Sequence, residues 1–118
     1  MRSTHHGHAH VVQLIGELDM NTSTAFEHEL KCVEATAVRE IIVDLSGLTF
    51  IGADGLKVLI QANARSRSGG KQLVLVRGPD QVQATFETTG LLSQMPFADY
   101  GQLRSLLHSH RPPMCMAA

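Results

Sequence analysis

Four histidines lie within the first ten residues of the chain, and they are the first side chains whose spacing could do chemistry. Neutral imidazoles grouped this closely suit Zn²⁺, Ni²⁺ or Cu²⁺. A specific metal site also needs fixed ligand geometry and supporting hydrogen bonds, which a chain terminus rarely provides. We therefore predict a polar lead-in over residues 1–10, able to pair as an edge strand, and no metal site. The histidines are His5, His6, His8 and His10.

A second place for chemistry is the run Gly52-Ala53-Asp54-Gly55, which precedes a predicted helix. The first backbone N–H groups of a helix have no partner within the helix, so they attract an anion or an acidic group of a binding partner. Small residues leave these groups accessible. We expect the working surface of the protein to lie here.

The elements that position this run are a strand before it and a helix after it. Glu40–Leu45 is an almost unbroken, β-branched apolar run, which is typical of a strand buried on both faces. Residues 46–52 are expected to form a short, turn-rich connector, and the helix is expected to begin at about Ala53. Its expected buried side consists of Leu56, Leu59, Ile60 and Asn63.

The first helix is expected earlier in the chain, after a strand at Val11–Leu18. Thr24 and Glu27 have the spacing of a capping box, and Asn21 and Thr22 are competing caps. This helix is expected to run to about residue 37, with Phe26, Leu30, Val33 and Ala37 on its core side.

The remaining pattern alternates strands and helices, which favours an α/β fold with parallel strand pairs. We predict a single α/β domain over residues 11–110, with a small mixed or parallel sheet and about four helices, followed by a tail over residues 111–118. The further elements are a strand at Gln72–Val76, a helix near Asp80, an edge strand at Met95–Phe97 and a last helix from about Tyr100.

The composition excludes several classes of protein. A net charge of -1 gives no general attraction to nucleic acid or to acidic membranes, and no apolar run reaches the ~20 residues of a membrane span. The N-terminus lacks the apolar core of a signal peptide, and Cys32 and Cys115 make no disulfide framework, so we expect a cytoplasmic protein. No phosphate-binding glycine loop, zinc-protease motif or nucleophile elbow is present, so we expect neither an enzyme nor a cofactor.

Three separated stretches resemble the STAS domain, the fold of bacterial anti-sigma factor antagonists and of sulfate-transporter tails. They are Gly16-Glu17-Leu18-Asp19, the run DLSGLTFIGADGL from Asp44 to Leu56, and Gly78-Pro79 with Thr89-Gly90-Leu91. The resemblance covers roughly Val11 to His108. It implies a module that docks on a kinase-like anti-sigma factor and thereby regulates sigma-dependent transcription.

At the start of the predicted helix, however, the sequence departs from the family pattern. In STAS antagonists the serine two places before Gly-Leu is phosphorylated by the partner kinase, and here that position is Ala53. Gly52 replaces the preceding Asp of the family. We therefore predict that the protein cannot be switched at this position and that Ser46 and Thr49 do not replace the missing hydroxyl.

Two acids at the candidate surface have alternative interpretations. Asp19 is either a turn former, for which its short hydrogen-bonding side chain is suited, or a partner contact. The second alternative follows from the resemblance, which places its turn beside the connector. Asp54 is either an acid favoured by the helix macrodipole, which is our preference, or a built-in phosphate mimic; Lys57 could pair with it weakly. The alternative function is a ligand-sensing domain that binds a nucleotide or small anion at Gly52–Gly55. The candidate partner-binding residues are Asp19, Asn21, Ser46, Thr49, Gly52, Ala53, Asp54, Gly55 and Lys57.

Overall fold

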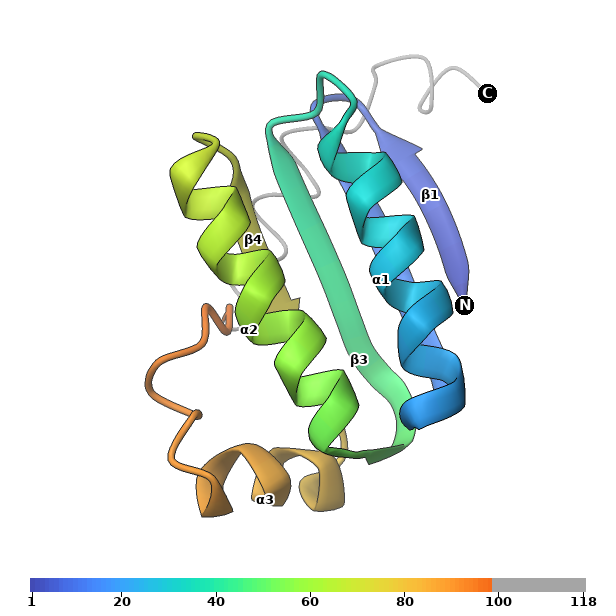
Figure 1. Ribbon diagram of the computed structural model, residues 1–118, viewed down its shortest axis with the longest axis vertical. Coiled ribbons are helices and arrows are strands. Elements are labelled where there is room, and N and C mark those ends of the chain that lie inside the picture. Colours follow the sequence, from blue (N-terminus) through green and yellow to red (C-terminus); the bar gives the residue numbers. More distant parts are fainter. Residues whose placement is uncertain (99–118) are drawn as a thin grey trace, which may run out of the picture.

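The computed structural model describes residues 1–98 and shows one sheet with two helices packed side by side on one of its faces (Figure 1). A third helix, α3, lies at the end of the sheet near the start of α2. No helix of these residues is long and apolar enough to cross a membrane. In chain order the elements are β1 (Arg2–His6), β2 (Ala9–Leu18), α1 (Met20–Glu34), β3 (Glu40–Ile51), α2 (Ala53–Ser68), β4 (Gln72–Val76) and α3 (Asp80–Thr88).

The sheet is mixed, with the strand order β1-β2-β3-β4. β1 runs antiparallel to β2, whereas β2, β3 and β4 are parallel to one another. The predicted α/β class and the mixed sheet are confirmed. The described residues contain three helices instead of about four, because the helix predicted from Tyr100, like the tail over residues 111–118, lies outside them.

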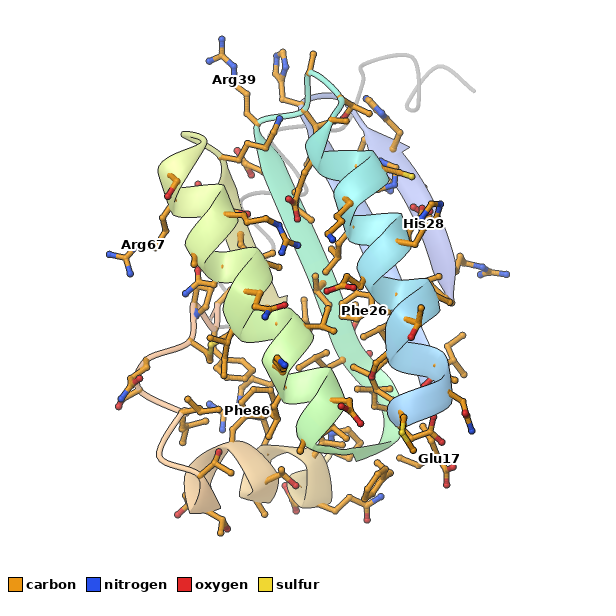
Figure 2. The ribbon with its side chains drawn as sticks, viewed as in Figure 1. Glu17, Phe26, His28, Arg39, Arg67 and Phe86 are labelled. Atoms are coloured by element: carbon orange, nitrogen blue, oxygen red, sulfur yellow. The ribbon has the colours of Figure 1, made fainter. Side chains whose placement is uncertain are left out.

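Both faces of the central strand are buried, which explains its unbroken apolar run. Ile41 and Val43 point into the main core beneath α1 and α2, and Ile42 points into a smaller cluster on the opposite face. Figure 2 shows Phe26 and Phe86 among the side chains of the molecule, and both are fully buried in the main core. The burial of large apolar side chains on the helical face is the main force holding the layers together.

β3 is longer than we predicted, because residues 46–51 continue the strand instead of forming a turn-rich connector. The end of β2 supplies a partner for these residues, and two register shifts, at Gln13/Ile15 and Gly16/Glu17, accommodate extra residues in β3. Gly47 allows this pairing, since a Cβ at that position would lie 2.8 Å from the carbonyl oxygen of Leu14. The backbone polar groups of residues 46–51 therefore find partners in the sheet.

Both long helices differ in detail from the prediction. α1 begins at Met20 with Asp19 as its N-cap, so the predicted capping box at Thr24 and Glu27 is wrong, and the helix ends at Glu34 with Ala37 exposed. On α2, Leu56 and Leu59 are buried as expected, but Ile60 is 42% exposed. The predicted stripe was rotated because α2 packs against the sheet and α1 together. Its buried residues are Gly55, Leu56, Val58, Leu59, Ala62 and Ser66.

The histidine-rich start of the chain forms the edge strand β1. His5 lies opposite His10 of β2, with their rings 5.9 Å apart in an edge-to-face arrangement, and the Ser3 hydroxyl contacts the His10 ring. Among residues 1–98 no group of three or more His, Cys, Asp or Glu side chains is arranged to hold a metal ion. Residues 2–6 and 9–10 thus belong to the sheet, and residues 7–8 form the turn between its first two strands.

Burial lowers the pKa of His10 below its usual range, while Glu29 of α1 opposes this effect and His5 and His6 add to it. The unfolded chain then binds the proton more tightly than the folded protein does. The contribution of His10 to stability is therefore present above the unfolded pKa of about 6.5 and is lost as the pH falls below it.

We predict that His10→Gln makes the stability of the protein less sensitive to acid. Between about pH 7.5 and pH 5.5, the free energy of unfolding should fall more for the wild type than for the variant. Urea denaturation at the two pH values measures this difference. Equal losses in the two proteins would contradict the prediction.

Candidate functional site

The parallel pairing of β2 and β3 brings the starts of α1 and α2 together. Leu18 and Ile51 are register partners at the ends of the two strands, and the N–H of Gly52 donates to the carbonyl oxygen of Leu18 at 2.9 Å. Asp19 and Ala53 follow directly in the two chain segments. The expected position of the Asp19 turn beside the segment that precedes Ala53 is what the structure shows.

Asp19 has a clear structural role as the N-cap of α1. Its Oδ1 accepts hydrogen bonds from the backbone N–H groups of Asn21 and Thr22, each at 3.0 Å, and from the Thr22 hydroxyl at 3.1 Å. The Thr22 backbone N–H is the main cause that lowers the pKa of Asp19, because it stabilises the carboxylate. Within residues 1–98, all of these hydrogen bonds go to Oδ1 and none goes to Oδ2.

The start of α2 is more open than the start of α1. Its N-cap, Gly52, offers no side-chain hydrogen bond, and the side chains of Ala53 and Asp54 are exposed. Asp54 and Lys57 are both exposed and form no ion pair in the part of the chain that the structure describes. A carboxylate in the first turn is favoured by the positive end of the helix dipole.

Ser46 and Thr49 lie along β3 instead of at the helix start. The N–H of Ser46 donates to Asp44 Oδ1 at 2.9 Å, and six residues separate Ser46 from Ala53 along the chain. The Thr49 hydroxyl donates to the carbonyl oxygen of Gly16 at 3.1 Å. Of the two candidate residues on β3, Ser46 lies farther from the helix start than Thr49 does.

Three exposed apolar side chains near these helix starts were missed by the sequence analysis. Met20 is 72% exposed at the first position of α1, Phe50 is 50% exposed at the end of β3, and Ile15 on β2 is 61% exposed. Phe50 faces outward because of the register shift at Gly16/Glu17, which no local sequence pattern reveals. For Met20 one local signal was available: it directly follows the Asp19 turn, which was already a candidate part of the surface.

Comparisons with known proteins identify the family of the chain. A family model described as "Mlab, STAS domain" matches residues 1–96. The chain belongs to the STAS domain family. The anti-sigma-F factor antagonist RsfB of Mycobacterium tuberculosis is 34% identical to this STAS domain over 74 residues, which are 63% of this chain and 60% of the relative.

Solved structures show the same fold. An anti-sigma factor antagonist from Mycobacterium paratuberculosis superposes with a TM-score of 0.79 at 24% identity, over 91% of this STAS domain and 92% of that chain. The Bacillus cell fate determinant SpoIIAA in its phosphorylated form gives a TM-score of 0.68 at 18% identity, over 88% of this chain and 96% of that one.

Gly55 of the candidate set is a packing residue. A Cβ at this position would lie 2.7 Å from Leu18 Cδ2 and 3.1 Å from Ile51 Cγ1. The absence of a side chain therefore lets the first turn of α2 sit directly on the ends of β2 and β3. This contact fixes where Ala53 and Asp54 are presented.

We predict that Gly55→Ala lowers the free energy of unfolding by about 1–2 kcal/mol, because overpacking outweighs the gain in helix propensity. Gly69→Ala is the matched control at the other end of α2. Its φ of -89° suits alanine, and an added Cβ would lie 3.3 Å from the Arg65 carbonyl oxygen, a looser contact than the 2.7 Å at Gly55. We expect this surface change to stay within about 0.5 kcal/mol. Urea denaturation of both variants measures the difference, and equal effects would contradict the packing role of Gly55.

Proposed function

We propose that this STAS domain is a non-catalytic interaction module that docks on a kinase-like anti-sigma factor and so regulates sigma-dependent transcription. Its relatives support this, since they are anti-sigma factor antagonists. The docking surface consists of the two helix starts and the strand ends that precede them. We call this the helix-start surface and define it by Asp19, Met20, Phe50, Ala53 and Asp54.

The observation that carries the proposal is the pair of exposed apolar side chains within this surface. Met20 and Phe50 flank the polar groups of the two helix starts, and the Phe50 ring lies against Gly52, where an added Cβ would be 3.3 Å from it. Large apolar side chains next to polar groups are typical of a protein interface, where aromatic residues and methionine are enriched.

Ala53 determines how such a module is regulated. Phosphorylation adds about two negative charges and disrupts docking by repulsion and desolvation, but it needs a hydroxyl. The side chain at position 53 has none and is exposed at the first position of α2. We infer that the protein remains competent to dock in the presence of the partner kinase.

The alternative, a sensor for a nucleotide or small anion at Gly52–Gly55, finds less support. Asp54 places a carboxylate in the first turn of α2, where its negative charge repels an incoming anion. Met20 and Phe50 offer this helix start apolar surface instead of additional donors. Both features suit a protein partner better.

We predict that the double substitution Met20→Ala/Phe50→Ala weakens binding to the anti-sigma factor by roughly tenfold or more, as expected for anchors at an interface. The experiment is calorimetry against each purified anti-sigma factor of the source organism. Ile60→Ala is the matched control, because Ile60 is 42% exposed on α2 away from the helix start. Absence of binding by the wild type would refute the proposed function, and an equal loss in the control would refute the docking surface.

We further predict that Ala53→Ser creates a switch. The variant should bind the anti-sigma factor about as tightly as the wild type until kinase and ATP are supplied, and roughly tenfold or more weaker afterwards, because the added phosphate is repelled and desolvated. Mass spectrometry locates the phosphate and calorimetry measures the affinity. The wild type treated in the same way is the control, and stoichiometric phosphate between Ser46 and Leu56 in it would contradict the prediction.

A further inference from the structure

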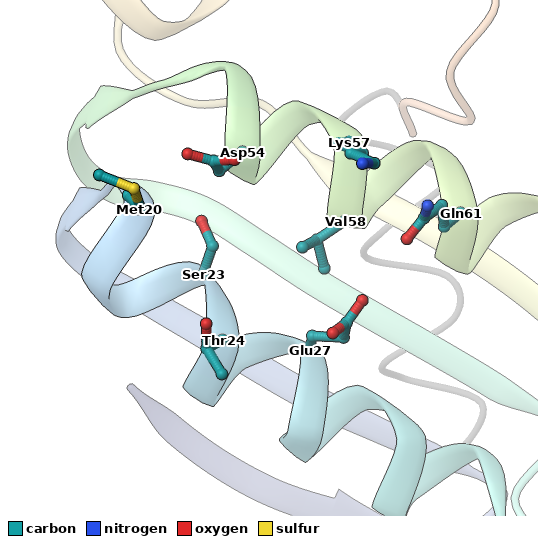
Figure 3. A pocket seen from close by; sticks show the side chains of 8 residues that line it. All are labelled: Met20, Ser23, Thr24, Glu27, Asp54, Lys57, Val58 and Gln61. Carbon is teal, nitrogen blue, oxygen red and sulfur yellow. The ribbon is translucent and has the colours of Figure 1, made fainter.

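A groove of about 350 Å³ runs between the first turns of α1 and α2, beside the helix-start surface. Figure 3 shows Ser23 and Glu27 on the α1 wall facing Asp54 and Val58 on the α2 wall. Their chemistry points to a specific occupant.

Ser23 is the first indication that the groove receives a ligand group. The residue is only 4% exposed, and its Oγ has no hydrogen-bond partner among the described residues. A buried hydroxyl without a partner costs free energy, so native proteins usually provide one. In Figure 3 this hydroxyl points from α1 toward α2, into the groove.

The charges of the groove indicate that its occupant is a cation. Glu27 and Asp54 stand on opposite walls, and neither carboxylate has a hydrogen bond or ion pair within residues 1–98. The nearby guanidinium of Arg65 is hydrogen-bonded to Glu34, at 2.8 Å from Nε and 3.0 Å from Nη2, and the charge of Glu27 also raises the pKa of Arg65. Among the described residues Lys57 is the one cation that lines the groove, and with Glu27 and Asp54 it leaves one net negative charge there.

Apolar groups in the same groove suit the stem of a long side chain. Met20 is 72% exposed at the mouth, and Val58 lines the wall of α2. Basic side chains commonly lay their methylene groups along such surfaces while the charged end reaches polar partners.

We propose that this groove is a socket for an arginine side chain of the docked partner protein. Arginine fits because its planar guanidinium carries five N–H donors and a permanent charge. The walls of the groove offer two carboxylates and a hydroxyl as acceptors. The inference rests on the proposed function and names a determinant of partner choice within it. It assigns Asp54 a role opposite to that of a phosphate mimic: neutralising Asp54 weakens docking, whereas neutralising a mimic would strengthen it.

The first test uses the full chain and a defined probe, without a partner. Nuclear magnetic resonance follows the amide signals during titration with N-acetyl-arginine methylamide, and with the citrulline analogue as a neutral probe of the same shape. We expect saturable shifts at Ser23, Glu27 and Asp54 with the arginine probe only. Glu27→Gln and Ser23→Ala should abolish them, and Glu87→Gln on α3 should not. Equal shifts with both probes, or none at these residues, would overturn the socket.

The second test separates the socket from the proposed function. Glu27→Gln and Asp54→Asn should each weaken binding to the anti-sigma factor by roughly tenfold, since a desolvated charge pair is broken, while Glu87→Gln leaves it unchanged. Unchanged or stronger binding by both groove variants would overturn the inference. If the wild type binds no anti-sigma factor, the proposed function fails, and the probe titration still decides whether the groove binds a guanidinium.

Discussion

The parallel pairing of β2 with β3 along their whole lengths is the constraint on which the rest of this structure depends. It ends with Leu18 beside Ile51 and with the hydrogen bond from Gly52 to Leu18. Because both strands end at the same edge of the sheet, the two helices that follow must begin side by side. The candidate site exists because of this pairing, and neither helix start could form it alone.

The two helices differ in how their first backbone N–H groups are satisfied. α1 satisfies its first N–H groups with the Asp19 side chain, whereas α2 begins at Gly52 without a side-chain cap. Gly55 lets the first turn of α2 lie against Leu18 and Ile51, so this uncapped start is rigidly placed although it is open to solvent. Position 53 is consequently held at a fixed place on the surface. Whether its side chain carries a hydroxyl decides whether it can be phosphorylated.

The surface around position 53 combines apolar side chains with unpaired carboxylates. Met20 is exposed next to the groove that contains Glu27 and Asp54. An apolar contact provides binding free energy with little selectivity, whereas charges that must be desolvated discriminate between partners. A surface that contains both is suited to recognising one kind of protein among related ones.

The sequence alone determined the class of the fold, because burial patterns are local. The apolar run from Ile41 to Leu45 predicts a strand covered on both faces, whatever covers it. The small residues at Gly52–Gly55 likewise marked the start of a helix, and the three STAS-like stretches gave the family. Each of these signals lies within one short segment of the chain, where residue type and spacing are sufficient.

The tertiary structure decided what depends on two segments at once. Residues 46–51 became a strand because the end of β2 was available to pair with them, and the register shift then turned Phe50 outward. Asp19 became the cap of α1 in place of Thr24, since the length of β2 sets where the helix begins. Ser23 faces Asp54 only because the parallel strands bring α1 and α2 together. Register and helix contact are set by packing between distant segments, so no local pattern could have predicted them.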